Sequence, residues 1–143
     1  TSLALEAEEM ERTNLRLQAK YKEICENEVR FEAVNCDDAD FVLIAFGSIA
    51  RVCMSAMEIG RKEGLKIGVL RPITLYPFPT LKIQELAKKA KGILTVELSA
   101  GQMVEDVRLA VNGSIPVEFY GRMGGVVPTP EEVLEQLKKQ LVK

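Results

Sequence analysis

An unbroken apolar segment at residues 41–46 is the clearest structural signal in the chain. Because its apolar residues do not alternate with polar ones, it predicts a strand that is buried on both faces by helices. Gly47 and Ser48 end the segment, and apolar residues from Ile49 onward then recur with the 3.6-residue period of an amphipathic helix. A strand, a tight turn and a helix in this order open a βα unit, so we expect an α/β fold.

The same order of strand and helix recurs downstream. Further strands are predicted at residues 65–70, 93–97 and 115–120, and further helices at residues 80–91, at residues 102–111 and from residue 130 onward. Residues 29–33 alternate between apolar and polar side chains, which indicates a half-exposed strand at one sheet edge. Right-handed crossovers make the last four strands parallel. We therefore expect a three-layer α/β/α domain whose five-stranded mixed sheet has four parallel strands and one antiparallel edge strand.

A long helix is predicted at the start of the chain, because residues 2–26 contain neither Pro nor Gly. One apolar series recurs every seventh position: Leu3, Met10, Leu17 and Ile24. A second series, four positions on, consists of Ala7, the polar Asn14 and Tyr21. This heptad pattern indicates a helix that packs on its own domain or on a neighbouring domain, or else associates with a second copy. We expect residues 1–27 to be a connector helix and residues 28–143 to be a single domain.

Composition and charge narrow the class of protein. A chain of 143 residues that is 47% hydrophobic has enough apolar mass for one core. A net charge of −2 gives no reason to expect nucleic acid or anionic membrane as a partner. The glutamates near the start argue against a signal peptide, and Thr1 in place of Met favours a processed or excised piece. Three widely spaced cysteines fit reduced thiols, so we expect a cytoplasmic protein.

The chain is poor in catalytic side chains. It contains no histidine, which excludes Ser-His-Asp and Cys-His catalysis and histidine-based zinc sites within these residues. Three cysteines cannot supply the four ligands of the usual iron–sulfur cluster. Neither G-x-G-x-x-G nor a P-loop is present. We therefore predict no catalytic, cofactor-binding or metal-binding residue in this chain.

Polar side chains gather where the predicted parallel strands end, and ligands of α/β sheets bind at that edge. The candidate rim and interface residues are Ser48, Arg51, Arg71, Glu97, Gln102 and Arg122. With the free N–H groups of nearby helix starts, they would suit a phosphate or a partner's carboxylate. The alternative is that the serines only cap helices, Ser99 with Gln102 as a capping box, and that the arginines are solvated. For Glu97 the choice lies between bonding loop N–H groups and proton transfer.

Four segments at this rim resemble one family. They are Gly47-Ser48-x-x-Arg51, residues 70–79, residues 97–108 with their GQM-x-x-DVR stretch, and residues 121–132 with GR-x-GG-x-x-PTPEE. The chain resembles the C-terminal part of the alpha subunit of 2-oxoacid:ferredoxin oxidoreductases, closest to the 2-ketoisovalerate type. The likeness runs from about residue 40 to the end and includes the long leading helix.

The resemblance implies a transketolase C-terminal-like fold, in agreement with the reading from the residues. It also implies a cytoplasmic enzyme of anaerobic metabolism that decarboxylates a 2-oxoacid oxidatively with coenzyme A, thiamine pyrophosphate, Mg and iron–sulfur clusters. The cofactor sites of the family lie in other domains or subunits, so this chain is expected to bind none of them. Its implied partners are those domains, a thiamine-binding subunit and a ferredoxin-like subunit. The chain itself would be a non-catalytic domain that serves assembly and shapes the active site.

Two other functions stay open at this point. One is a free-standing module that binds an anion or nucleotide at the arginine-lined rim, and the other is a dimerisation module that uses the first helix. The loop at residues 121–125 has three glycines in five residues, which suits close approach of a partner. We expect this loop, with Arg122, to be an interface element.

Overall fold

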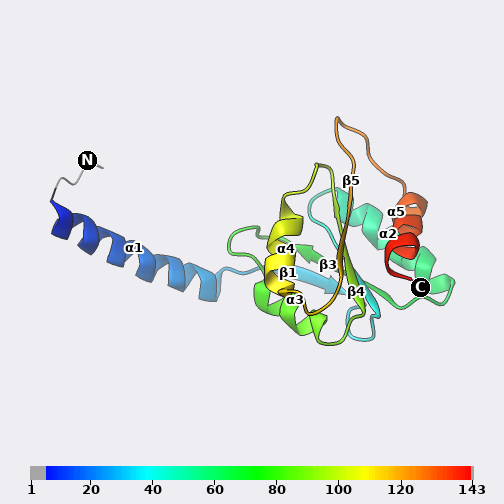
Figure 1. The fold of residues 1–143 in the computed structure, drawn as a ribbon, viewed down its shortest axis with the longest axis horizontal. Coiled ribbons are helices and arrows are strands. Elements are labelled where there is room, and N and C mark those ends of the chain that lie inside the picture. Colours follow the sequence, from blue (N-terminus) through cyan, green and yellow to red (C-terminus); the bar gives the residue numbers. More distant parts are fainter. Residues whose placement is uncertain (1–5, 143) are drawn as a thin grey trace.

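The computed structural model describes residues 6–142 and contains a single five-stranded sheet (Figure 1). The strands are β1 (Phe31–Val34), β2 (Phe41–Ile44), β3 (Ile67–Pro72), β4 (Gly92–Glu97) and β5 (Val117–Gly121). Their order across the sheet is β1-β3-β2-β4-β5, so β2, which was predicted to be buried on both faces, lies in the middle. Strands β2 to β5 are parallel and β1 pairs antiparallel with β3 at one edge. The predicted fold class is confirmed.

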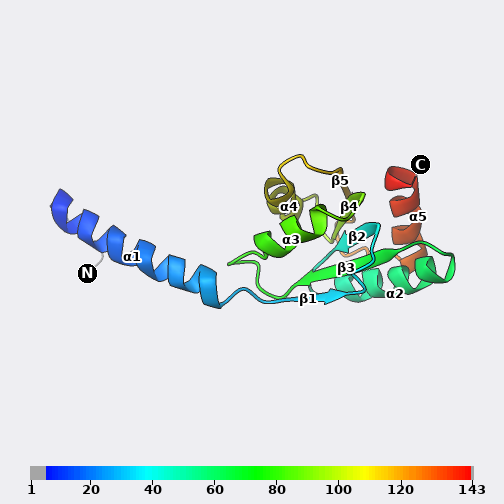
Figure 2. The same cartoon turned by 90° about the horizontal axis from the view of Figure 1, so that it is seen from below.

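Four helices cover the two faces of the sheet (Figure 2). They are α2 (Ile49–Lys62), α3 (Thr80–Ala87), α4 (Met103–Val111) and α5 (Pro130–Leu141). Helices α2 and α5 enclose one half of the core with Leu43 and Leu94, and α3 and α4 enclose the other half with Ile44 and Ile93. Neighbouring residues of β2 and β4 therefore point into opposite halves of the core, which explains why β2 is apolar throughout and why β4 is buried even at Thr95 and Glu97.

Helix α1 (Ala7–Asn27) extends away from the sheet, as Figure 1 shows, and none of its residues is buried. The predicted helix forms, but it does not pack along its own domain. Packing on a neighbouring domain or on a second copy stays a prediction. Residues 2–5 of the predicted helix lie outside the described residues. Within the described part of the chain, no helix combines the length and apolar character that a membrane span needs.

The first turns of α5 and α4 are capped in different ways. At α5 a capping box is present: the Thr129 hydroxyl accepts from Glu132 N at 3.2 Å, and the Glu132 carboxylate accepts from Thr129 N at 2.8 Å. At α4 the predicted Ser99–Gln102 box is wrong, because Gln102 makes no side-chain capping bond. A residue of the preceding strand takes over that role, as described below.

Candidate functional site

The carboxyl ends of the parallel strands form the rim at which the candidate residues were expected to meet. Strand β2 leads into α2 on one face of the sheet, whereas its neighbour β4 leads into α4 on the other face. Loops that diverge in this way leave a crevice at the strand ends, which is the usual ligand position in such sheets. A small hollow of about 200 Å³ lies there, lined by Phe46, Leu75, Gln102, Met103 and Asp106.

Glu97 stands at the end of β4 and is only 2% exposed. Its carboxylate accepts hydrogen bonds from the backbone N–H groups of Gln102, Met103 and Val104 at 2.9–3.3 Å, and from the Ser99 hydroxyl at 3.1 Å. These N–H groups lie at the start of α4 and have no acceptor inside the helix. Glu97 therefore caps α4 from the preceding strand, and its negative charge lies at the positive end of the helix dipole.

The same contacts bear on anion binding at the rim. Because the Glu97 carboxylate already occupies the N–H groups at the start of α4, a phosphate there would meet a like charge. At α5 the Thr129 hydroxyl fills the equivalent position. Two of the helix starts that were expected to offer free N–H groups are thus occupied by the chain's own side chains.

Ser48 and Arg51 lie at the start of α2, and both are exposed. Ser48 is the N-cap residue, but its backbone is already helical (φ −68°, ψ −34°) and its side chain makes no capping bond. The alternative that Ser48 is an ordinary cap is therefore wrong. The backbone N–H of Arg51 donates to Ser48 O at 3.1 Å, so the first turn is closed by the main chain.

Arg71 lies inside β3 rather than in the loop after it, because β3 ends two residues later than the sequence pattern indicated. It pairs in register with Glu32 of β1, and their side chains form an ion pair at 3.3 Å. Its Nε is buried without a hydrogen-bond partner among the described residues. Arg71 thus serves the antiparallel edge of the sheet.

Arg122 follows β5 and links that strand to α5. Its backbone N–H donates to Glu97 O at 3.1 Å, and its guanidinium lies 3.4 Å from both the Tyr120 hydroxyl and the Glu132 carboxylate. The hydrogen bond to Tyr120 is the main cause that raises the pKa of Arg122, which stays a cation. Its side chain is 37% exposed, so part of the guanidinium still faces solvent.

The six candidates do not form one polar pocket. Glu97, Gln102 and Arg122 come together, whereas Ser48, Arg51 and Arg71 do not join them through any hydrogen bond or ion pair found among residues 6–142. What the sequence reasoning missed is apolar. The loops after β3, β4 and β5 expose a set of large hydrophobic side chains, the apolar rim: Ile73, Leu75, Leu98, Met123, Val126 and Val127.

The apolar rim is most prominent in the loop between β5 and α5, which projects beyond the body of the domain (Figure 1). Met123 is 59% exposed and Val127 is 57% exposed. Between them, Gly124 and Gly125 adopt left-handed backbone with φ of +68° and +85°. One signal in the sequence could have identified this exposed loop: apolar residues stand next to two glycines. Glycines favour left-handed backbone, which is not part of a helix or strand, so the apolar side chains beside them are left exposed.

The side chains of the described residues do not fit a metal or cluster site. No group of three or more His, Cys, Asp or Glu residues among residues 6–142 comes together in a way that could hold a metal ion. The cysteines are unpaired and lie apart: Cys25 is exposed, whereas Cys36 and Cys53 are buried. Burial raises the pKa of the Cys36 thiol and raises that of Cys53 to about 12.

Comparison with known sequences gives relatives along almost the whole chain. The ketoisovalerate oxidoreductase subunit VorB of Methanothermobacter thermautotrophicus is 47% identical over 139 residues, which are 97% of this chain and 39% of that protein. The 2-oxoglutarate synthase subunit KorA of Methanothermobacter marburgensis is 34% identical over 101 residues, or 71% of this chain and 27% of that protein. The chain thus spans about two fifths or less of the length of these curated relatives.

Solved structures share the fold. A 2-oxoglutarate:ferredoxin oxidoreductase from Magnetococcus marinus superposes with a TM-score of 0.82 at 24% identity, covering 95% of this chain and 24% of that one. A split-gene transketolase superposes with a TM-score of 0.66 at 20% identity, covering 77% and 40%. The predicted likeness to a transketolase-type domain is confirmed. Residues 39–133 match the model of the pyruvate:ferredoxin oxidoreductase core domain II, and the chain belongs to this family.

Proposed function

We propose that the chain is a non-catalytic domain of a thiamine-dependent 2-ketoisovalerate:ferredoxin oxidoreductase. The observation that carries this proposal is the 47% identity with a ketoisovalerate oxidoreductase subunit over 97% of the chain. In such an enzyme the thiamine pyrophosphate, Mg, iron–sulfur clusters and coenzyme A would be held by other domains and subunits. Three free cysteines support a cytoplasmic location, where thiols stay reduced.

The role of the domain in this proposal is assembly and shaping of a neighbouring active site. The apolar rim supports it, because exposed apolar side chains that gather in adjacent loops mark interaction surfaces. The partly exposed guanidinium of Arg122 lies beside these loops and offers a planar set of donors to a carboxylate or phosphate. Ser48, Arg51, Gln102 and Arg122 would face the remainder of the enzyme, whereas Arg71 pairs with Glu32 at the sheet edge and Glu97 caps α4 from within.

The isolated chain should not oxidise 2-oxoacids. Supplied with thiamine pyrophosphate, Mg, coenzyme A, 2-ketoisovalerate and an artificial electron acceptor, it is expected to give no turnover above a heat-denatured sample. The reason is that its buried carboxylate, Glu97, caps α4 and that the matched residues are 39% of the related subunit. Turnover by the chain alone would contradict the non-catalytic assignment.

Arg122→Ala tests the rim in the complete enzyme. We expect the melting temperature of chain 1–143 to change little, because the Arg122 contacts are long and partly exposed. Turnover or assembly of the complete enzyme should fall severalfold. Arg108→Ala is the matched control, since Arg108 is an exposed arginine paired within α4 to Glu105. Normal assembly and turnover with Arg122→Ala would remove Arg122 from the proposed interface.

A further inference from the structure

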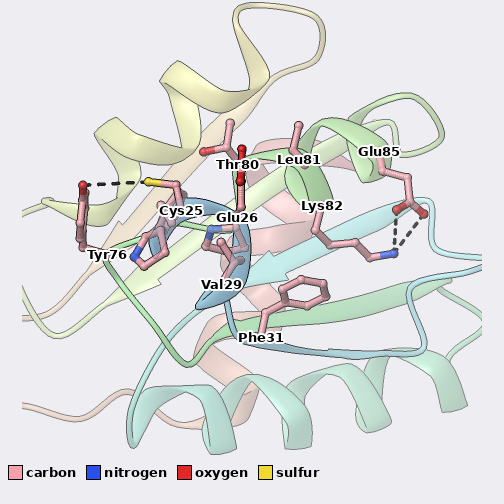
Figure 3. Close-up of a pocket in the computed structure, with 12 residues that line it drawn as sticks. Cys25, Glu26, Val29, Phe31, Tyr76, Thr80, Leu81, Lys82 and Glu85 are labelled. Carbon is pink, nitrogen blue, oxygen red and sulfur yellow. Dashed lines mark hydrogen bonds and ion pairs between the residues drawn. The ribbon is translucent and has the colours of Figure 1, made fainter. Parts of the chain in front are cut away.

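A second surface, separate from the apolar rim, lies where α1 meets the domain. A hollow of about 800 Å³ opens between the end of α1, the start of β1 and the segment that leads into α3. We call it the helix groove; its apolar lining residues are Val29, Phe31, Tyr76, Pro77, Phe78 and Leu81. Figure 3 shows Val29 and Phe31 between the Cys25–Tyr76 contact at one end and the Lys82–Glu85 ion pair at the other.

The segment between α1 and β1 is joined to the loop after β3 by hydrogen bonds. Arg30 O accepts from the N–H groups of Ile73 at 2.9 Å and Thr74 at 3.1 Å, and Arg30 N donates to the Thr74 hydroxyl at 3.0 Å. The rings of Tyr21 and Tyr76 meet edge to face with centroids 6.5 Å apart. The end of α1 therefore contacts the domain at the groove through Tyr76.

The apolar face of α1 continues from the groove toward the N-terminus. This face consists of Met10, Leu17, Tyr21 and Ile24, none of which is buried. A helix of 21 residues is roughly 30 Å long, and a helix without tertiary packing is only marginally stable in water. An apolar face and an apolar groove that adjoin each other and are both exposed are typical of an interaction surface.

The comparisons indicate which occupant this is. The match to the core domain II begins at residue 39, after α1 and β1, whereas the match to the ketoisovalerate oxidoreductase subunit covers 97% of the chain. Helix α1 is thus shared with that subunit but lies outside the core domain. The remainder of the subunit, about 61% of its length (100 minus the 39% matched), has no counterpart in this chain.

We infer that the helix groove and the apolar face of α1 form one docking surface for the part of the same subunit that lies outside residues 1–143. This inference rests on the proposed function. The docked segment is expected to present large apolar side chains to the groove and basic side chains to the acidic first turn of α1, which carries Glu8 and Glu9. A second copy fits less well, because Ala7 and the polar Asn14 interrupt the heptad series of α1.

Leu81→Asp in the full-length subunit, expressed with its partner subunits, tests this inference. Leu81 lines the groove and is 81% exposed, so the change should leave chain 1–143 folded. Leu109→Asp is the matched control, since Leu109 is a 78% exposed leucine of α4 that does not line the groove. The readout is the rate at which trypsin cuts α1, whose sites are Arg12, Arg16, Lys20 and Lys22.

In the unsubstituted full-length subunit, trypsin is expected to cut α1 at least roughly tenfold more slowly than in chain 1–143. The reason is that burial of the apolar face should shift the equilibrium between covered and exposed α1 by a factor of roughly ten or more. Leu81→Asp should abolish most of this protection and Leu109→Asp should keep it. Equal cutting in the full-length subunit and in chain 1–143 would overturn the inference, as would equal effects of the two variants. Protection of chain 1–143 that grows with its own concentration would assign the surface to a second copy and also overturn it.

Turnover of 2-ketoisovalerate, measured on the same samples, separates this inference from the proposed function. If the unsubstituted enzyme oxidises no 2-oxoacid, the proposed function fails whatever the state of α1. If it is active while α1 is cut freely, the proposed function stands and the docking surface does not.

Discussion

Glu97→Gln is expected to lower the free energy of unfolding of the chain by about 2–4 kcal/mol. The carboxylate accepts from three backbone N–H groups at the start of α4 and from the Ser99 hydroxyl, and the side chain is buried. An amide places an NH₂ group where one of the accepting oxygens was, so donors would face donors. At least one buried N–H loses its partner, and the helix dipole loses the negative charge at its positive end.

Urea denaturation of the purified chain measures this loss. Glu105→Gln is the control, because Glu105 also lies in the first turn of α4 but is exposed and pairs only with Arg108. Its substitution should change stability far less, as is usual for exposed positions. Equal stabilities of the two variants would mean that the Glu97 contacts do not hold the start of α4. Ser99→Ala, which removes one of the four donors, should give an intermediate loss.

The fold could be predicted from the sequence because the strands and helices have recognisable patterns of apolar residues. The unbroken apolar segment that became β2 requires cover on both faces, and the glycines and caps between the strands mark where helices begin and end. The parallel direction of the last four strands followed from right-handed crossovers, and the edge position of the first strand from the alternating pattern of residues 29–33. Strand ends were predicted less well, so Arg71 was expected in a loop and lies in β3.

The candidate site could be predicted only in part, because pattern does not reveal which partner a polar side chain finds. Glu97 was located correctly at the buried end of a strand, and one of its two suggested roles, bonding loop N–H groups, is the one observed. The competing assignment of Ser99 as the cap is wrong, because the Glu97 carboxylate of β4 accepts from the N–H groups at the start of α4. The apolar rim was overlooked, since an exposed Met123 or Val127 carries no periodic signal.

Gly121→Ala is expected to lower the free energy of unfolding by about 2–3 kcal/mol, because the end of β5 has no room for a side chain. A Cβ atom at Gly121 would overlap the carbonyl oxygen of Ser99 and the ring of Phe119. The ring can turn aside, but the carbonyl belongs to the loop that Glu97 holds through the Ser99 hydroxyl and the start of α4.

Gly124→Ala is the matched control in the same loop. No atom lies within 4 Å of a Cβ placed there, so its cost is limited to the left-handed backbone with φ of +68°, roughly 1 kcal/mol. Thermal and urea unfolding of both variants give the comparison. A larger loss for Gly121→Ala assigns Gly121 to the fold and leaves Gly124 and Gly125 as the residues that shape the exposed part of the loop. If Gly124→Ala costs as much or more, the contact between β5 and the Ser99 loop is not what requires glycine at residue 121.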